Sequence, residues 1–87
     1  MEAKIRWDPA KSDRVKRVRG VSFEEIVQAE FVSVLLHKKR AGQSLLLFRH
    51  NKYIWVIPCV YRGDEIFLKT LYPSRKYTKM MKRGELL

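Results

Sequence analysis

Residues 53–72 read YIWVIPCVYRGDEIFLKTLY, and this stretch decides the fold. Two β-branched and aromatic runs, Tyr53–Tyr61 and Glu65–Tyr72, flank a short polar turn, a pattern typical of two paired strands. If Gly63-Asp64 closes a two-residue hairpin, Arg62 lies opposite Glu65 and the register of both strands follows.

That register divides the side chains between two faces of the sheet. The better core face holds Trp55, Ile57, Cys59, Tyr61, Ile66, Leu68, Thr70 and Tyr72. The other face holds Val56, Pro58, Val60, Arg62, Glu65, Phe67, Lys69 and Leu71. Pro58 lacks a backbone N–H, so a bulge or a local sheet edge must accommodate it.

The open face places Arg62 and Lys69 among apolar walls, near the point where Arg75 and Lys76 follow the last strand. Two interpretations stay open for these cations. They form a cradle for phosphate groups, or they are ordinary solvated surface residues.

Upstream of the hairpin, the sequence predicts two more strands, Phe31–His37 and Gln43–His50, with a turn at residues 38–42. A tight hairpin signal, Asn51-Lys52, follows the second of them. A short strand at Ala3–Trp7 is indicated by alternating charged and apolar residues.

Two helices are predicted between the first strand and the rest. Asp8 as N-cap, followed by Pro9, predicts a helix from about Pro9 to Arg19. Gly20 is predicted to end this helix, and Val15 and Val18 are predicted to face inward. Ser22 and Glu25 form a capping box, with Val21 and Ile26 at staple spacing, so a second helix is predicted from Phe23 to about Glu30.

The residue pattern predicts an α+β fold in a single domain covering residues 1–87. A small antiparallel sheet of about five strands carries the two N-terminal helices on one face. The tail, residues 73–87, carries five basic residues and one acidic residue; a short helix and a flexible arm are both compatible with it.

Charge indicates the class of partner. The chain has 19 Lys and Arg against 9 Asp and Glu, a formal charge of +10 over 87 residues. Such a surplus favours a negatively charged partner: nucleic acid first, an anionic membrane second, and an acidic protein third. A cytoplasmic protein is expected, because the N-terminal residues lack the apolar core of a signal peptide and no run approaches a membrane span. The one cysteine, Cys59, is predicted to be a small buried hydrophobe.

The motifs of common metal and nucleotide sites are missing from the sequence, so sites of these kinds are not supported. RNA can be cleaved without one, because its own 2′-OH is the nucleophile, cations stabilise the phosphorane, and a base removes the 2′ proton. His37 and His50 fall at strand ends, where a surface role is the alternative. The candidate groups are Lys11, Arg62, Lys69, Arg75, Lys76, Tyr77 and His50. Residues 73–79 interleave cations, among them Lys79, with Tyr77, which could stack on a base.

Several motifs resemble a known family. Trp7-Asp8-Pro9-Ala10-Lys11 and then GVSFEE at residues 20–25 resemble the "WDPxK…HGVSFEEA" pattern of BrnT-type toxins. RGDEI at 62–66 is similar to their "RGDxI" hairpin, and Ser74-Arg75-Lys76 to the end of their "SARKA" motif. Arg19 stands where the family has His, the spacing from Ile66 to Arg75 is about two residues longer, and residues 31–50 match none of its patterns.

The resemblance implies a fold related to the RelE ribonucleases. It also implies a bacterial, growth-inhibiting endoribonuclease that needs no metal or other cofactor and acts on mRNA, including ribosome-bound mRNA. Its cognate antitoxin would be encoded beside it and would be of the ribbon-helix-helix type. By position, Lys11, Arg62 and Arg75 match basic family residues; together with His50 they are the catalytic candidates. Lys69, Lys76, Tyr77 and Lys79 are the RNA-binding candidates. A non-catalytic nucleic-acid-binding protein, and a module that binds only an acidic protein, remain the alternatives.

Overall fold

A computed structural model describes residues 4–36, 39 and 42–86. Six strands and three helices follow one another in the order β1 (Lys4–Arg6), α1 (Pro9–Arg19), α2 (Phe23–Ile26), β2 (Glu30–Leu36), β3 (Gln43–His50), β4 (Tyr53–Arg62), β5 (Glu65–Leu68), β6 (Tyr72–Ser74) and α3 (Arg75–Lys82). His37 and most of the predicted turn at residues 38–42 lie outside the described residues, as does Ala3.

The local signals for α1 are confirmed. Asp8 accepts a hydrogen bond from the Ala10 N–H at 3.0 Å, and Gly20 ends the helix with φ 86°. Val15 is buried as predicted, but the inward prediction for Val18 is wrong, since it is 71% exposed. The inward side of α1 is set instead by Ser12, whose hydroxyl accepts from the Phe23 N–H at 3.0 Å and donates to the Glu24 carboxylate.

The start of α2 is confirmed and its predicted end is wrong. Ser22 and Glu25 form both hydrogen bonds of the capping box. The helix has only four residues and ends at Ile26, because Glu30 already belongs to β2 and pairs with Arg49 of β3. Residues 27–29 continue in hydrogen-bonded turns, with the Ala29 N–H donating to the Ile26 carbonyl, and strand pairing takes Glu30.

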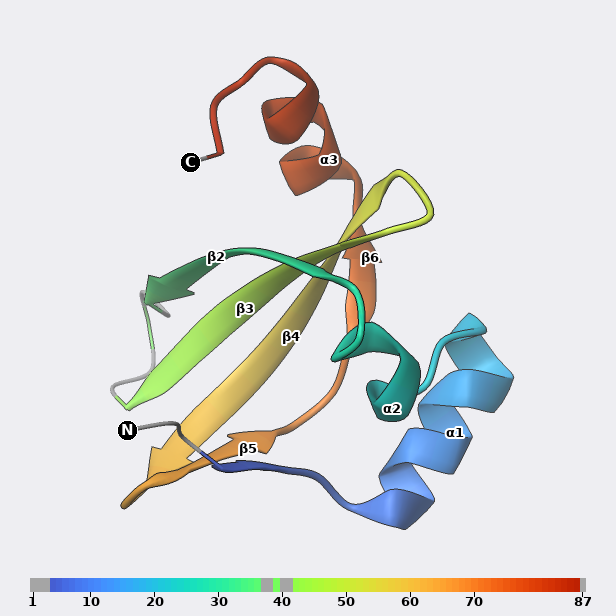
Figure 1. The fold of residues 1–87 in the computed structure, drawn as a ribbon, viewed down its shortest axis with the longest axis vertical. Coiled ribbons are helices and arrows are strands. Elements are labelled where there is room, and N and C mark those ends of the chain that lie inside the picture. The colour runs from blue at the N-terminus through green and yellow to red at the C-terminus, as the bar shows by residue number, and fades with distance from the viewer. Residues whose placement is uncertain (1–3, 37–38, 40–41, 87) are drawn as a thin grey trace.

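The sheet has the strand order β1-β5-β4-β3-β2, with β6 beside β4 (Figure 1). The α+β class with two N-terminal helices is confirmed. The sheet is mixed rather than wholly antiparallel, because β1 pairs with β5 in parallel, Ile5 opposite Ile66. Both hairpins follow their turn residues: Asn51 and Lys52 have φ 53° and 64°, and Arg62 lies opposite Glu65.

The predicted strand 65–72 is interrupted. Cys59 pairs with Leu68 and Val56 pairs with Tyr72, so two residues of β4 face three residues, 69–71, of the other strand. The extra residue reverses the alternation after it. Leu71 is therefore buried in the core, and Tyr72 lies on the other face, opposite to the predicted assignment of both.

The same interruption accommodates Pro58. Its carbonyl accepts from the Lys69 N–H at 2.8 Å, so its nitrogen, which has no hydrogen to donate, points toward the gap between β5 and β6. The N–H that proline lacks would therefore face a place where the backbone hydrogen bonds between strands are already interrupted.

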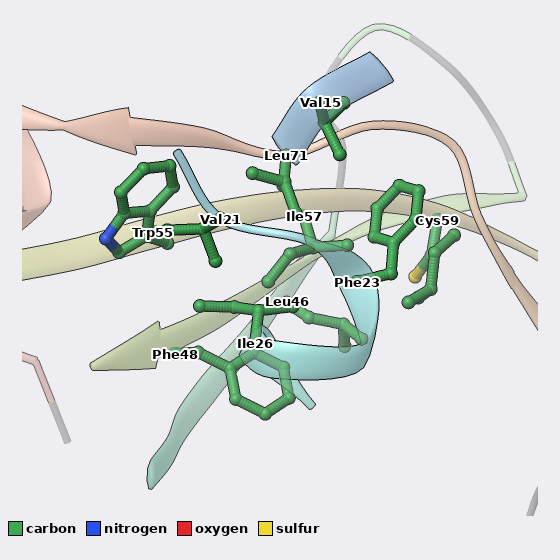
Figure 2. Packing of buried hydrophobic residues seen from close by; sticks show 11 residues of the cluster. Val15, Val21, Phe23, Ile26, Leu46, Phe48, Trp55, Ile57, Cys59 and Leu71 are labelled. Carbon is green, nitrogen blue, oxygen red and sulfur yellow. The ribbon is translucent and has the colours of Figure 1, made fainter. Parts of the chain in front are cut away.

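Two apolar clusters lie on the two faces of the sheet. On the α1/α2 face, Trp55, Ile57 and Cys59 of β4 pack with Val15, Phe23 and Ile26 of the helices (Figure 2). On the α3 face, Ile54 and Val56 pack with Leu47 and with side chains of α3. Cys59 is fully buried, and burial raises the pKa of its thiol; it is a core residue, as predicted.

The basic tail is an ordered element. Ser74 caps α3, the Thr78 hydroxyl accepts from the Ile54 N–H at 2.8 Å, and Leu86 packs on Ile54 and Val56. Figure 1 shows α3 beside the β3–β4 hairpin, away from α1 and α2. Within the described part of the chain, no helix is long and apolar enough to cross a membrane.

Candidate nucleic-acid interface

The α3 face of the sheet is covered over only part of its length. The helix packs over Ile54 and Val56, near the β3–β4 hairpin. Farther along β4, Pro58 and Val60 are half-buried and Arg62 is exposed. This uncovered part, with β5 and β1 beside it, is called the open half of the α3 face.

Arg62 is the most defined cation of the open half. The β4–β5 register sets it beside Phe67, and its guanidinium carbon lies 5.2 Å from the centroid of that ring. A guanidinium that stacks on a ring keeps its N–H groups free for another acceptor. Among the described residues, no carboxylate lies within 4.0 Å of Arg62.

Strand β1 brings two further cations to the same place. Its parallel register puts Lys4 beside Glu65 and Arg6 beside Phe67. The Arg6 Nε atom lies 3.4 Å from a Glu65 carboxylate oxygen, with both side chains about half exposed. An exposed ion pair of this kind adds little stability, so its main effect is to hold the carboxylate among cations.

Lys69 completes the group from the end of β5. It lies opposite Pro58 and is exposed. We call Lys4, Arg6, Arg62, Lys69 and Glu65 the cationic cluster; its four positive charges against one negative leave an excess of three. An exposed surplus of this sign beside a ring attracts phosphate groups and stacked bases.

The predicted RNA-binding residues on α3 form a second region. Lys76 and Lys79 are exposed, and the Lys76 ammonium lies 5.4 Å from the centre of the Tyr77 ring. Tyr77 itself is half-buried against the α3-face core. Its backbone N–H is held by the Ser74 hydroxyl at 3.1 Å.

The two predicted arginines are not brought together. Arg75 follows Ser74, which pairs with Ile54, whereas Arg62 is eight residues farther along β4. At about 3.3 Å per strand residue these positions are roughly 26 Å apart. Arg62 and Arg75 therefore cannot contact the same phosphate group, although one RNA strand could pass both.

His50 and Lys11 lie elsewhere. His50 pairs with Tyr53 at the hairpin end of the sheet, and its ring nitrogen Nε2 is 3.3 Å from the Asn51 amide. Lys11 belongs to α1, the helix that packs on the opposite face through Val15. Among the described residues, no hydrogen bond, ion pair or strand pairing joins Lys11 or His50 to the cationic cluster.

Glu65 and Phe67 share the face of Arg62, as the hairpin register predicts, whereas Lys4 and Arg6 join the candidate site through the structure alone. The alternation of charge along residues 4–7 indicated a strand, but no local pattern reveals that this strand pairs with residues 65–67. Among the described residues, no three His, Cys, Asp or Glu side chains gather as a possible metal site.

A third group of cations surrounds a pocket of about 200 Å³ between α3 and the β3–β4 hairpin. Arg49, Lys52 and Lys82 line it together with Thr78. Arg49 also forms an ion pair with Glu30 at 3.5 Å. Three separate groups of cations thus lie on the α3 side of the molecule.

No protein-family model and no curated protein matches the chain. Among solved structures, the crystal structure of the Brucella abortus ribonuclease toxin BrnT is similar, with a TM-score of 0.56 and 18% sequence identity. The match covers 83% of this chain and 96% of that one. An identity this low speaks to the backbone arrangement and not to the site. The chain therefore has the fold of the BrnT ribonuclease toxin.

Proposed function

We propose that this protein is an endoribonuclease toxin whose cleaving site is the cationic cluster. Two independent observations support the proposal. The backbone is similar to that of a ribonuclease toxin over most of both chains, and an arginine without a carboxylate partner lies at the uncovered end of the sheet. Arg62 over the Phe67 ring, in register opposite Glu65, is the observation that carries the chemistry.

The proposed reaction is attack by the RNA 2′-oxygen on its neighbouring phosphorus, with release of the 5′-oxygen. Arg62 and Lys69 stabilise the negative charge that develops on the phosphorane oxygens. Glu65, opposite Arg62, accepts the 2′ proton, and a proton from water goes to the leaving 5′-oxygen. No metal enters this scheme, because the cations supply the charge.

The residues of α3 have a different role in this proposal. Arg75, Lys76, Tyr77 and Lys79 bind the RNA on one side of the cleaved bond, since they lie too far from Arg62 to touch the reacting phosphate. Lys11 and His50 lie on neither surface, and we expect their alanine variants to cleave at close to the wild-type rate.

A labelled RNA incubated with the purified protein in EDTA tests the cleavage. We expect Arg62→Ala to lose about 10²–10³ in rate, as for removal of a charge-stabilising donor. Arg17→Ala, which removes another exposed arginine, on α1, is the matched control and should cleave normally. Intact RNA with the wild-type protein would reject the proposal, and cleavage that EDTA stops would reject its metal independence.

In cells, the same proposal predicts growth arrest on induction, which Arg62→Ala relieves. We further propose a cognate antitoxin, encoded beside this gene and of the ribbon-helix-helix type, which restores growth. Cleavage of translated mRNA only would show dependence on the ribosome.

Non-catalytic nucleic-acid binding is the second candidate. It is favoured by the Arg6–Glu65 contact, which occupies the proposed base with a cation. Tight, salt-sensitive RNA binding without cleavage would establish it.

A further inference from the structure

The α1/α2 face of the sheet is also covered incompletely. α2 ends after one turn, and beyond it Phe31 and Val34 of β2 are 55% and 47% exposed. Across the sheet, Ile5 of β1 and Tyr61 of β4 are 40% and 49% exposed. Single exposed hydrophobic residues are ordinary on protein surfaces, whereas a group of them marks an interaction site.

These four side chains line one groove. Its volume is about 460 Å³, and every residue that lines it is apolar or aromatic. Leu46 and Phe48 of β3 form part of the lining, and Val27 and Ala29 bring in the segment after α2. Phe31 is held against Phe48 edge to face, with ring centroids 5.6 Å apart. Four of the six large exposed hydrophobic residues in the described part of the chain thus share one groove.

We propose that this groove binds an amphipathic, acidic helix of a partner protein. A helix is favoured because α1 and α2 already form a helical layer on this face, and the groove is the place where that layer is missing. A helix presents apolar side chains at three- and four-residue intervals along one side, which is the shape that such a groove accepts.

Charge distinguishes an acidic partner from a second copy of the chain. Each copy carries +10, so joining two copies through this groove would bring two like charges together. The chain neighbours of Ile5 on the edge strand β1 are Lys4 and Arg6, whose side chains lie on the other face and are reached around that edge. Acidic residues flanking the apolar stripe of the helix can reach these cations.

The inference rests on the proposed function in one respect: the partner is taken to be the antitoxin that blocks RNA cleavage. Tyr61 and Ile66 line the groove, while Arg62 and Glu65, their chain neighbours, belong to the cationic cluster on the reverse of the same strands. A partner seated in the groove and continuing around the β1 edge would reach the cluster and shield it from RNA.

The test uses the whole chain and, as the probe, the purified product of the open reading frame adjacent to its gene. Val34→Lys places a charge in the groove, and Val18→Lys is the matched control, a valine that is 71% exposed on α1. We expect Val34→Lys to weaken the complex by about tenfold or more in titration calorimetry. Val18→Lys should bind like the wild type.

Two more measurements test the chemistry of the partner. Affinity should fall as salt rises, because acidic residues meet cations. Circular dichroism should show a gain of helical signal when the two proteins are mixed. Equal binding by both valine variants, a salt-independent affinity, or no gain of helix would each overturn the inference, as would no complex with the wild type.

Light scattering, which measures the oligomeric state, tests whether a second copy of the chain occupies the groove. If the wild type is a dimer and Val34→Lys is a monomer, the groove binds a second copy of the chain, and the proposal of a partner helix is wrong. The cleavage assay of the free Val34→Lys protein separates this inference from the proposed function. If Val34→Lys cleaves RNA at the wild-type rate and binds the partner as the wild type does, only the proposal for the groove is rejected. If the wild type does not cleave RNA, only the proposed function is rejected.

Discussion

Arg62 lies over the ring of Phe67, with 5.2 Å between the guanidinium carbon and the ring centroid. The contact holds a long, exposed side chain in one orientation without occupying its hydrogen-bond donors. It is the feature that distinguishes Arg62 from the other exposed cations of the open half.

Removal of this ring should therefore weaken RNA binding. A contact between a cation and an exposed ring contributes about 0.5–1 kcal/mol, so Phe67→Ala should lower RNA affinity by roughly two- to fivefold. Fluorescence anisotropy with a short labelled RNA measures this. Phe31→Ala, on the opposite face, is the control and should bind RNA normally. Identical affinities for both variants would contradict the role given to the ring.

Ser12 joins α1 to α2 and should matter for stability rather than activity. Its hydroxyl accepts from the buried Phe23 N–H at 3.0 Å. Ser12→Ala leaves that donor without a partner, which costs about 1–3 kcal/mol. Urea unfolding should show the loss, whereas Ser33→Ala, a half-buried serine on β2, should change little. A stability equal to wild type would mean that water replaces the hydroxyl.

Acid should remove part of the stability through Glu25. The Lys16 ammonium, at 2.7 Å, and the Ser22 N–H together lower the pKa of this carboxyl from 4.5 to about 2. A depressed pKa contributes stability above the unfolded value and loses it as pH falls through the folded value. The loss is therefore expected between pH 4.5 and 2.

Urea midpoints measured across that range provide the check. Glu25→Gln should flatten this part of the profile, because the variant has no carboxyl to protonate. A wild type and a variant that lose stability in parallel would show that other carboxylates control the acid transition.

Thr78 attaches α3 to the sheet. Its hydroxyl accepts from the Ile54 N–H at 2.8 Å and donates to the Ser74 carbonyl at 2.6 Å. Thr78→Val keeps the shape and removes both bonds, at a cost of about 1–3 kcal/mol. Faster amide exchange in residues 75–82, measured by mass spectrometry, should accompany the loss. Thr70→Val serves as the control, and unchanged exchange in α3 would refute the attachment.

The sequence predicts the elements whose signals are local. Asp8 with Pro9, Gly20, and Ser22 with Glu25 mark helix ends, and each acts over a few residues. The hairpin at Gly63 follows in the same way, and with it the pairing of Arg62 with Glu65. Tertiary competition decides the rest: α2 ends early because Glu30 pairs with Arg49.

The candidate site was predictable only in part. Arg62 and Lys69 on an open face follow from the hairpin register. The contribution of β1 does not, because a parallel pairing between residues 4–6 and 65–67 leaves no trace in either segment. The separation of Arg75 from Arg62 also needed the structure, since it depends on where β6 joins β4.

The additional residue between Leu68 and Tyr72 makes chain length, rather than side-chain identity, the critical property of this segment. It directs Leu71 to one side of the sheet and Tyr72 to the other. The helix α3 lies on the same side as Tyr72. Deletion of Thr70 would send α3 toward the side that α1 and α2 occupy, and would leave Ile54 and Val56 uncovered. Substitutions in residues 69–71 should thus be tolerated far better than insertions or deletions, and homologous chains should vary there in composition but not in length.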